Sequence, residues 1–176
     1  MPNPAGAAVA ISDRRFYAYA LLTGLIAGLV GVAFHFSVEV IARWPRLLRA
    51  TLGETPLAIL LAALVGVLFA TIALFLVRRF APEAAGSGVP DVEGAMEGTV
   101  AVPWRRILPV KFFGGILALS SGMMLGREGP TIHLGASVAV ALGERFRLNS
   151  IDGRALLAAG GAAGLAAAFN APLAAI

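Results

Sequence analysis

The chain opens with two long apolar stretches separated by a short polar one. Residues 16–38 and 57–77 are each long enough to cross the hydrocarbon layer of a membrane, for which about 20 residues suffice. Between them, residues 39–56 carry three arginines and a tryptophan, a mixture typical of the membrane–water boundary. The pattern predicts a helical hairpin through the membrane, preceded by a loose tail over residues 1–15, which are rich in Pro, Ala and Gly.

Beyond Arg79 the apolar stretches become short and are broken by glycine, proline and polar residues. Proline is favoured at the first position of a helix, where its missing N–H is not needed. Helix starts are therefore predicted at residues 86–90, 126–130 and 170–172. The residues expected to support these starts are Pro90, Pro130, Asn170 and Pro172. Pro130 is predicted to be the first residue of a helix that runs to residue 142.

Broken helices restrict where this part of the chain can lie. Non-helical backbone is tolerated at membrane depth only where it is buried in protein or lines a cavity. Helix N-termini carry partial positive charge and free N–H groups, so several of them directed at one place form an anion site. Residues 155–168 are rich in Ala and Gly, and Gly160 and Gly164 are spaced to let two membrane helices approach closely. The predicted fold is an all-α polytopic membrane protein with broken helices.

The second predicted helix start contains an isolated acid. Glu128 lies in Gly126-Arg127-Glu128-Gly129-Pro130, and residues 117–125 and 131–142 on either side contain no other acid. An ionisable side chain at membrane depth is a functional candidate. Either the carboxylate caps its own helix, or it occupies an anion site from which an anion or a proton displaces it. The apolar flanks favour the second interpretation and make Glu128 a candidate gate.

Ser87 and Lys111 each admit two interpretations. The Ser87 hydroxyl can cap the helix that begins at Pro90, or it can donate to an anion at that helix end. Lys111 either extends to the membrane surface or is a buried charge. In the second case its partner would be Glu93 or Glu97, and the spacing does not decide between them.

Composition narrows the class of protein. The chain of 176 residues is 59% hydrophobic and 14% charged, with a mean hydropathy of +0.84, which fits an integral membrane protein. The net charge of +4 is scattered over segment ends without a continuous basic face, so nucleic acid is not an expected partner. There is no cysteine, no nucleotide-binding or zinc motif, and nothing places His133 within reach of Ser87. We expect neither an enzyme nor a metal or organic cofactor.

Taken together, the motifs resemble those of the CLC family of chloride channels and proton-coupled chloride antiporters. The resemblance rests on residues 86–90, 108–115, 126–130 and 164–173. It covers most of the chain after the tail, and the bacterial antiporter branch is the most similar. It implies an inverted-repeat membrane fold, with the first repeat largely present in a transmembrane domain over residues 16–176. It also implies a multi-pass protein of the bacterial inner membrane, and we place the N-terminus in the cytoplasm.

The resemblance implies roles for individual residues. The positions implied to bind chloride are Gly86, Ser87, Gly88, Arg127 and Gly129. Ser87 would donate its hydroxyl to the central anion, and backbone N–H groups of the second motif would face the anion path. Glu128 would be the external gate, whose protonation opens the path and carries a proton. Serine at position 87 favours chloride or nitrate over fluoride.

The main departure from the family is length. Family members carry two inverted halves, and this chain ends within the first of them. We therefore expect a fragment of a longer transporter, which requires a C-terminal half or a second subunit. The complete protein is expected to be a homodimer in the lipid bilayer that exchanges chloride for protons. A passive chloride channel and a non-transporting membrane scaffold are the alternatives.

Overall fold

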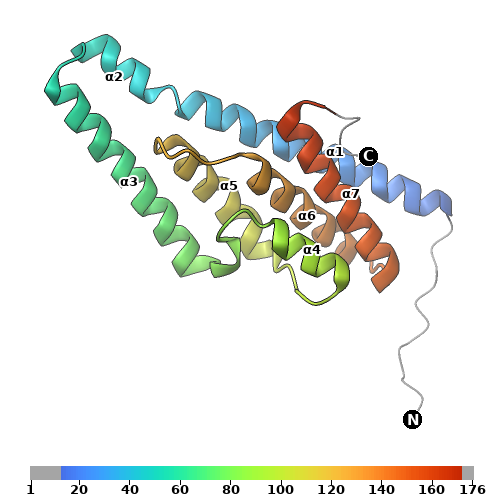
Figure 1. Cartoon of the computed structure of the whole chain (residues 1–176). Helices are drawn as coiled ribbons and strands as arrows, with labels where there is room; N and C mark the ends of the chain where they lie inside the picture. Colours follow the sequence, from blue (N-terminus) through green and yellow to red (C-terminus); the bar gives the residue numbers. More distant parts are fainter. Residues whose placement is uncertain (1–12, 172–176) are drawn as a thin grey trace.

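The computed structural model describes residues 13–171, and the regular elements of that part of the chain are all helices (Figure 1). In chain order they are α1 (Asp13–Ile41), α2 (Trp44–Leu52), α3 (Pro56–Phe80), the 3-10 helix η1 (Pro82–Ala84), α4 (Val89–Glu97), α5 (Trp104–Ser120), α6 (Glu128–Arg145) and α7 (Ser150–Phe169). The all-α prediction is confirmed. Residues 13–15 of the predicted tail begin α1, and residues 1–12 lie outside the described part.

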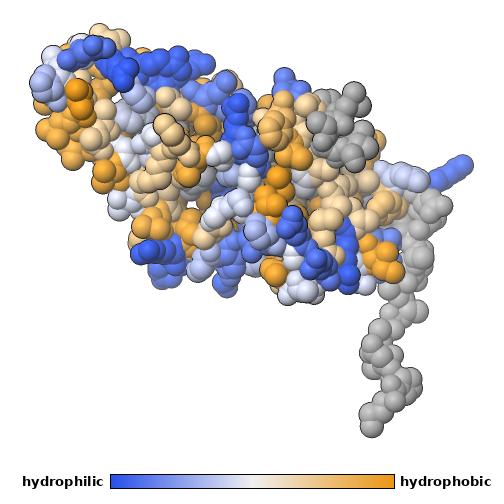
Figure 2. Space-filling view, viewed as in Figure 1, coloured by the Kyte–Doolittle hydropathy of each residue, from blue (hydrophilic) through white to orange (hydrophobic). Residues whose placement is uncertain are grey.

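Helices α1 and α3 coincide with the two predicted spans. Each contains a stretch that is long and apolar enough to cross a membrane, and each is a few residues longer than predicted. Much of their apolar surface is exposed, as Figure 2 shows for one face of the molecule. Examples are Leu21, Leu25 and Leu29 on α1 and Ile59, Leu64 and Val67 on α3. Apolar surface of this extent is typical of helices that face lipid.

The contact between α6 and α7 forms the centre of the molecule. A Cβ built on Gly160 would lie 2.6 Å from the Cβ of Ala139, and one built on Gly164 would lie 2.8 Å from the carbonyl carbon of Thr131. Neither position has room for a side chain, so the two backbones are in direct contact. The close approach predicted from the spacing of Gly160 and Gly164 is confirmed.

The other helices surround this pair. Helix α1 packs against α5, α6 and α7, where Phe34, Ile116 and Leu134 form a buried cluster. A larger apolar cluster joins α4, α5, α6 and α7 and includes Val92 and Leu156. Helix α3 lies at the edge of the core, where it contacts α2, η1 and α5 (Figure 1). This placement leaves space between α3 and α5, in front of the loop before α4 and the first turn of α6.

Two of the three predicted helix starts are present. Helix α4 begins at Val89, after Gly88 with a φ of +82°, a conformation that glycine adopts without strain. Helix α6 begins at Glu128, two residues before the predicted Pro130, and continues to Arg145. Proline is tolerated throughout the first turn, because the N–H groups there have no acceptor within the helix. Pro130 therefore lies inside the first turn without marking its first residue.

Asn170 ends α7. Its φ of +53° is left-handed and its N–H donates to the carbonyl of Ala166. Asparagine tolerates this conformation better than most residues other than glycine. The helix start predicted at residues 170–172 would continue into Pro172, which lies outside the described residues, so it stays a prediction.

Candidate functional site

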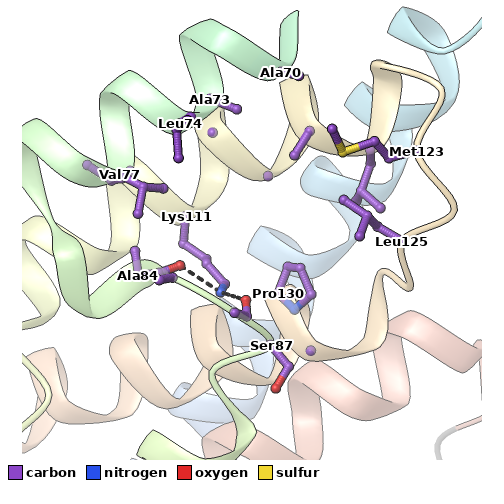
Figure 3. A pocket seen from close by; sticks show the side chains of 18 of the residues that line it. Ala70, Ala73, Leu74, Val77, Ala84, Ser87, Lys111, Met123, Leu125 and Pro130 are labelled. Carbon is purple, nitrogen blue, oxygen red and sulfur yellow. Dashed lines mark hydrogen bonds between the residues drawn. The ribbon is translucent and has the colours of Figure 1, made fainter. Parts of the chain in front are cut away.

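A cavity of about 800 Å³ lies between α3 and α5 and reaches the loop before α4 and the first turn of α6 (Figure 3). Its wall is largely apolar, with contributions such as Val67, Leu74 and Val77 from α3. The predicted site residues that line it are Gly86, Ser87, Lys111, Glu128, Gly129 and Pro130. The structure thus brings both predicted helix starts to one cavity. Gly88 and Arg127 are absent from its lining.

The two helix starts are in direct contact. A Cβ on Gly129 would lie 2.7 Å from the Cβ and 2.8 Å from the carbonyl oxygen of Ser87. Gly88 packs on His133 in the same way, since a Cβ there would lie 2.7 Å from the Cβ of that histidine. Glycine at these positions lets the first turns of α6 pack against the loop that precedes α4.

The Ser87 side chain is exposed and takes part in a local hydrogen bond. Its Oγ accepts from the backbone N–H of Val89 at 3.3 Å. A hydroxyl group has one proton to donate in addition to its acceptor capacity. The same side chain can therefore support the start of α4 and donate to a molecule in the cavity.

Glu128 is the half-buried first residue of α6. Its carboxylate lies back over its own loop, where Oε2 occupies the space that a Cβ on Gly126 would need. Within residues 13–171 it forms no cap hydrogen bond and no ion pair. The attraction to an exposed helix N-terminus contributes only about 0.3–1 kcal/mol. The carboxylate is therefore weakly held at the edge of the cavity.

Lys111 is buried, with 4% of its surface exposed. Its ammonium group donates to the carbonyl oxygens of Ala84 at 3.0 Å and Gly86 at 2.7 Å (Figure 3). The predicted partners were wrong, because Glu93 and Glu97 are both exposed on α4. The burial of Lys111 could have been predicted from its spacing along the helix. Lys111 is one residue from the buried Val110 and shares a helix face with Ile107 and Gly114, which are also buried.

Arg127 points toward α1 and not into the cavity. Its Nη1 lies 3.1 Å from Nε2 of His35, and the same Nε2 lies 3.6 Å from a carboxylate oxygen of Glu39. A guanidinium group only donates, so His35 accepts through Nε2 and is neutral in this arrangement. This contact could not be predicted from the sequence, because the two residues are 92 positions apart.

His133 is fully buried on α6, and within the described part of the chain neither ring nitrogen has a hydrogen-bond partner. Ser87 and His133 therefore do not form a hydrolase pair in this structure. No group of three or more His, Cys, Asp and Glu side chains is placed to hold a metal ion within residues 13–171.

Residues 69–176 match the model of the family described as voltage gated chloride channel. The chain belongs to this family. The matched region contains both helix starts and the cavity residues that they contribute, together with Lys111. The expected membership in the chloride channel and antiporter family is thereby confirmed.

Curated members of the voltage gated chloride channel family are similar in sequence. The H(+)/Cl(-) exchange transporter ClcA of Vibrio cholerae serotype O1 is 52% identical over 161 residues, which cover 89% of this chain and 34% of that protein. The protein of the same name from Citrobacter koseri is 48% identical over 163 residues, with the same coverage of 89% and 34%. The chain spans about a third of the length of the curated relatives it matches.

Solved structures in the family are also similar. A slow cyanobacterial Cl-/H+ antiporter superposes with a TM-score of 0.88 at 40% identity, over 94% of this chain and 39% of that chain. A eukaryotic CLC transporter superposes with a TM-score of 0.75 at 28% identity, over 91% and 32% of the two chains. The predicted CLC-type fold is confirmed by these matches.

Proposed function

We propose that the protein forms the first part of a transporter that exchanges chloride for protons, with its anion site between the loop before α4 and the first turn of α6. The observation that carries this proposal is the shared cavity, where the two helix starts meet Ser87, Lys111 and Glu128. The exchange transporters among its relatives support the choice of chloride and protons.

The electrostatics of the cavity favour an anion. Two helix N-termini contribute partial positive charge at its edge. The Lys111 ammonium adds a full charge behind Gly86, and its two carbonyl partners hold it in place. The Ser87 hydroxyl and the backbone N–H groups near Gly129 supply donors, and the apolar wall strengthens each of these interactions by excluding water.

Glu128 acts as the gate in this proposal. Its ionised carboxylate competes with chloride for the positive end of α6, so anion entry requires that it leave. Protonation removes its negative charge and ends the competition, and the neutral side chain carries the proton. The weak anchoring of the carboxylate supports this role, because a side chain held by several bonds would not exchange with an anion.

In this proposal the described residues form only part of the cavity wall, and the rest of the assembly completes it. The cavity is open, with Gly86 and Ser87 exposed, so a C-terminal half or a second copy of the chain supplies the rest of the wall. The assembly is a homodimer that crosses the bacterial inner membrane several times, with the N-terminus of each chain in the cytoplasm. Chloride or a similar small anion such as nitrate, together with protons, is the transported cargo.

The test is chloride and proton flux from liposomes. The chain is reconstituted alone and together with the part of the Vibrio cholerae relative that it does not cover. Glu128→Gln is compared with Glu93→Gln, which removes the same charge from an exposed position outside the cavity. We expect Glu128→Gln to move chloride without protons, and Glu93→Gln to retain coupled exchange.

Proton coupling that survives in Glu128→Gln would refute the gate. Chloride flux without protons in the unmodified protein would indicate a passive channel. Absence of flux in both preparations, with monodisperse protein, would favour a scaffold role.

A further inference from the structure

Helix α2 carries a basic side that no other part of the described chain uses. Arg43 precedes the helix, and Arg46 and Arg49 follow at intervals of three residues, which places the three guanidinium groups along one side. All three arginines are exposed, and no residue of α2 is buried. Figure 2 shows hydrophilic surface along this edge of the molecule, beside the apolar surface of α3.

The orientation of this basic side is fixed by Trp44. Its indole N–H donates to the carbonyl of Ser120 at the end of α5, at 2.8 Å. Its ring meets Phe69 of α3 edge to face, with 6.0 Å between centroids. Because Trp44 is anchored to two other helices, α2 cannot rotate freely, and the arginines remain on the outer side.

The arginines have no acidic partner within the described residues. The ion pair found there joins Arg105 to Glu144, and the close neighbour of Glu39 is His35, so neither of these acids is paired with an arginine of α2. Leu47 follows Arg43 by four residues and so lies beside it on the helix surface, where it is 67% exposed. The helix therefore presents guanidinium groups and an uncovered apolar side chain together.

Its place in the chain determines what this surface faces. Helix α2 is the last part of the first candidate membrane span, Arg14–Leu52, and it precedes the turn into the second, Pro56–Phe80. It therefore lies at the end of a span, near the membrane boundary. Helices with an arginine side and a leucine and tryptophan side lie in that boundary. The guanidinium fork matches the oxygen geometry of a phosphate group.

We infer that α2 binds the headgroups of anionic phospholipids through Arg43, Arg46 and Arg49, with Leu47 inserted among the acyl chains. Three positive charges without acidic neighbours are complementary to a negatively charged lipid surface. This inference does not depend on the proposed transport function.

The test uses Trp44 as a local reporter of bound lipid. The chain has two tryptophans, so Trp104→Phe leaves Trp44 as the single donor. The protein is placed in phosphatidylcholine vesicles that contain a trace of dansyl-labelled phosphatidylglycerol or dansyl-labelled phosphatidylcholine, and energy transfer from Trp44 is measured. We expect greater transfer to the anionic lipid, and a loss of this preference at high salt.

Three triple variants locate the site. Replacement of the α2 arginines by glutamine should lower the preference for the anionic lipid by roughly a hundredfold, about fivefold for each arginine. The matched control is Arg78→Gln, Arg79→Gln and Arg106→Gln, which removes three exposed arginines elsewhere and should leave the preference unchanged. Replacement of the α2 arginines by lysine retains the charge and shows that the helix still folds.

Three outcomes decide the inference. Equal transfer to the two labelled lipids would overturn it. A preference that survives in the glutamine variant of α2 would also overturn it, because the anionic lipid would then bind elsewhere. A preference lost in that variant, retained with lysine and retained in the control would establish the site.

Discussion

Replacement of Gly164 by alanine tests the packing of α6 against α7. The added Cβ would lie 2.8 Å from the carbonyl carbon of Thr131 and 3.2 Å from the Cα of Ile132, whereas non-bonded carbons pack at about 3.5–4.0 Å. The helices must therefore separate by about 1 Å, which forfeits about a quarter to a half of the dispersion energy of the affected atom pairs. Overpacking of this kind costs about 1–3 kcal/mol.

Gly153 on the same helix provides the matched control, because a Cβ there would meet nothing within 4 Å. Both alanines improve helix propensity by up to about 1 kcal/mol, so the difference between the two variants isolates the clash. We expect Gly164→Ala to be less stable than Gly153→Ala by about 1–3 kcal/mol in the free energy of unfolding. The assay is an SDS titration in mixed micelles, followed by helical circular dichroism. Equal stability of the two variants would refute the packing argument.

Three further predictions concern single side chains. Lys111→Met should lower the free energy of unfolding by about 1–3 kcal/mol, because it leaves two carbonyl oxygens without their donor. Lys111→Arg should recover part of the lost stability. An unchanged free energy of unfolding in the Met variant would contradict the prediction. Nitrogen NMR of His35 above neutral pH should show a neutral ring with its proton on Nδ1, since Nε2 accepts from Arg127. A proton on Nε2 would exclude the hydrogen bond between Arg127 and His35. Asn149→Ala should cost about 1 kcal/mol, because Oδ1 of Asn149 accepts from the backbone N–H of Asp152 at 2.7 Å. Asn149→Ser retains a cap acceptor and should recover most of this loss in the same titration, whereas equal stability of the Ala variant and the unmodified chain would contradict the cap.

The sequence predicted the parts of the fold that depend on local chemistry. The lengths of the apolar stretches identified α1 and α3, and the small residues at positions 160 and 164 identified a close helix contact. The predicted start of α6 was two residues late, because proline fits any position of a first turn and so marks the turn and not its first residue.

What the sequence did not predict are interactions between distant parts of the chain. The partners of Lys111 are backbone carbonyls, which have no sequence signature, and the contact of Arg127 with His35 joins two helices that sequence spacing does not relate. The cavity likewise depends on where α3 lies relative to α5.

The contact between Gly129 and Ser87 limits how the cavity can open. Their backbones leave no space between the first turn of α6 and the loop before α4, so neither segment can shift inward without displacing the other. The two segments therefore have few independent degrees of freedom at this point. The Glu128 side chain, by contrast, has rotatable bonds and no fixed partner among residues 13–171. In the proposed transport function, access to the cavity then changes through rotation of one side chain on a nearly stationary frame, a motion that can be fast because it requires no helix to unpack.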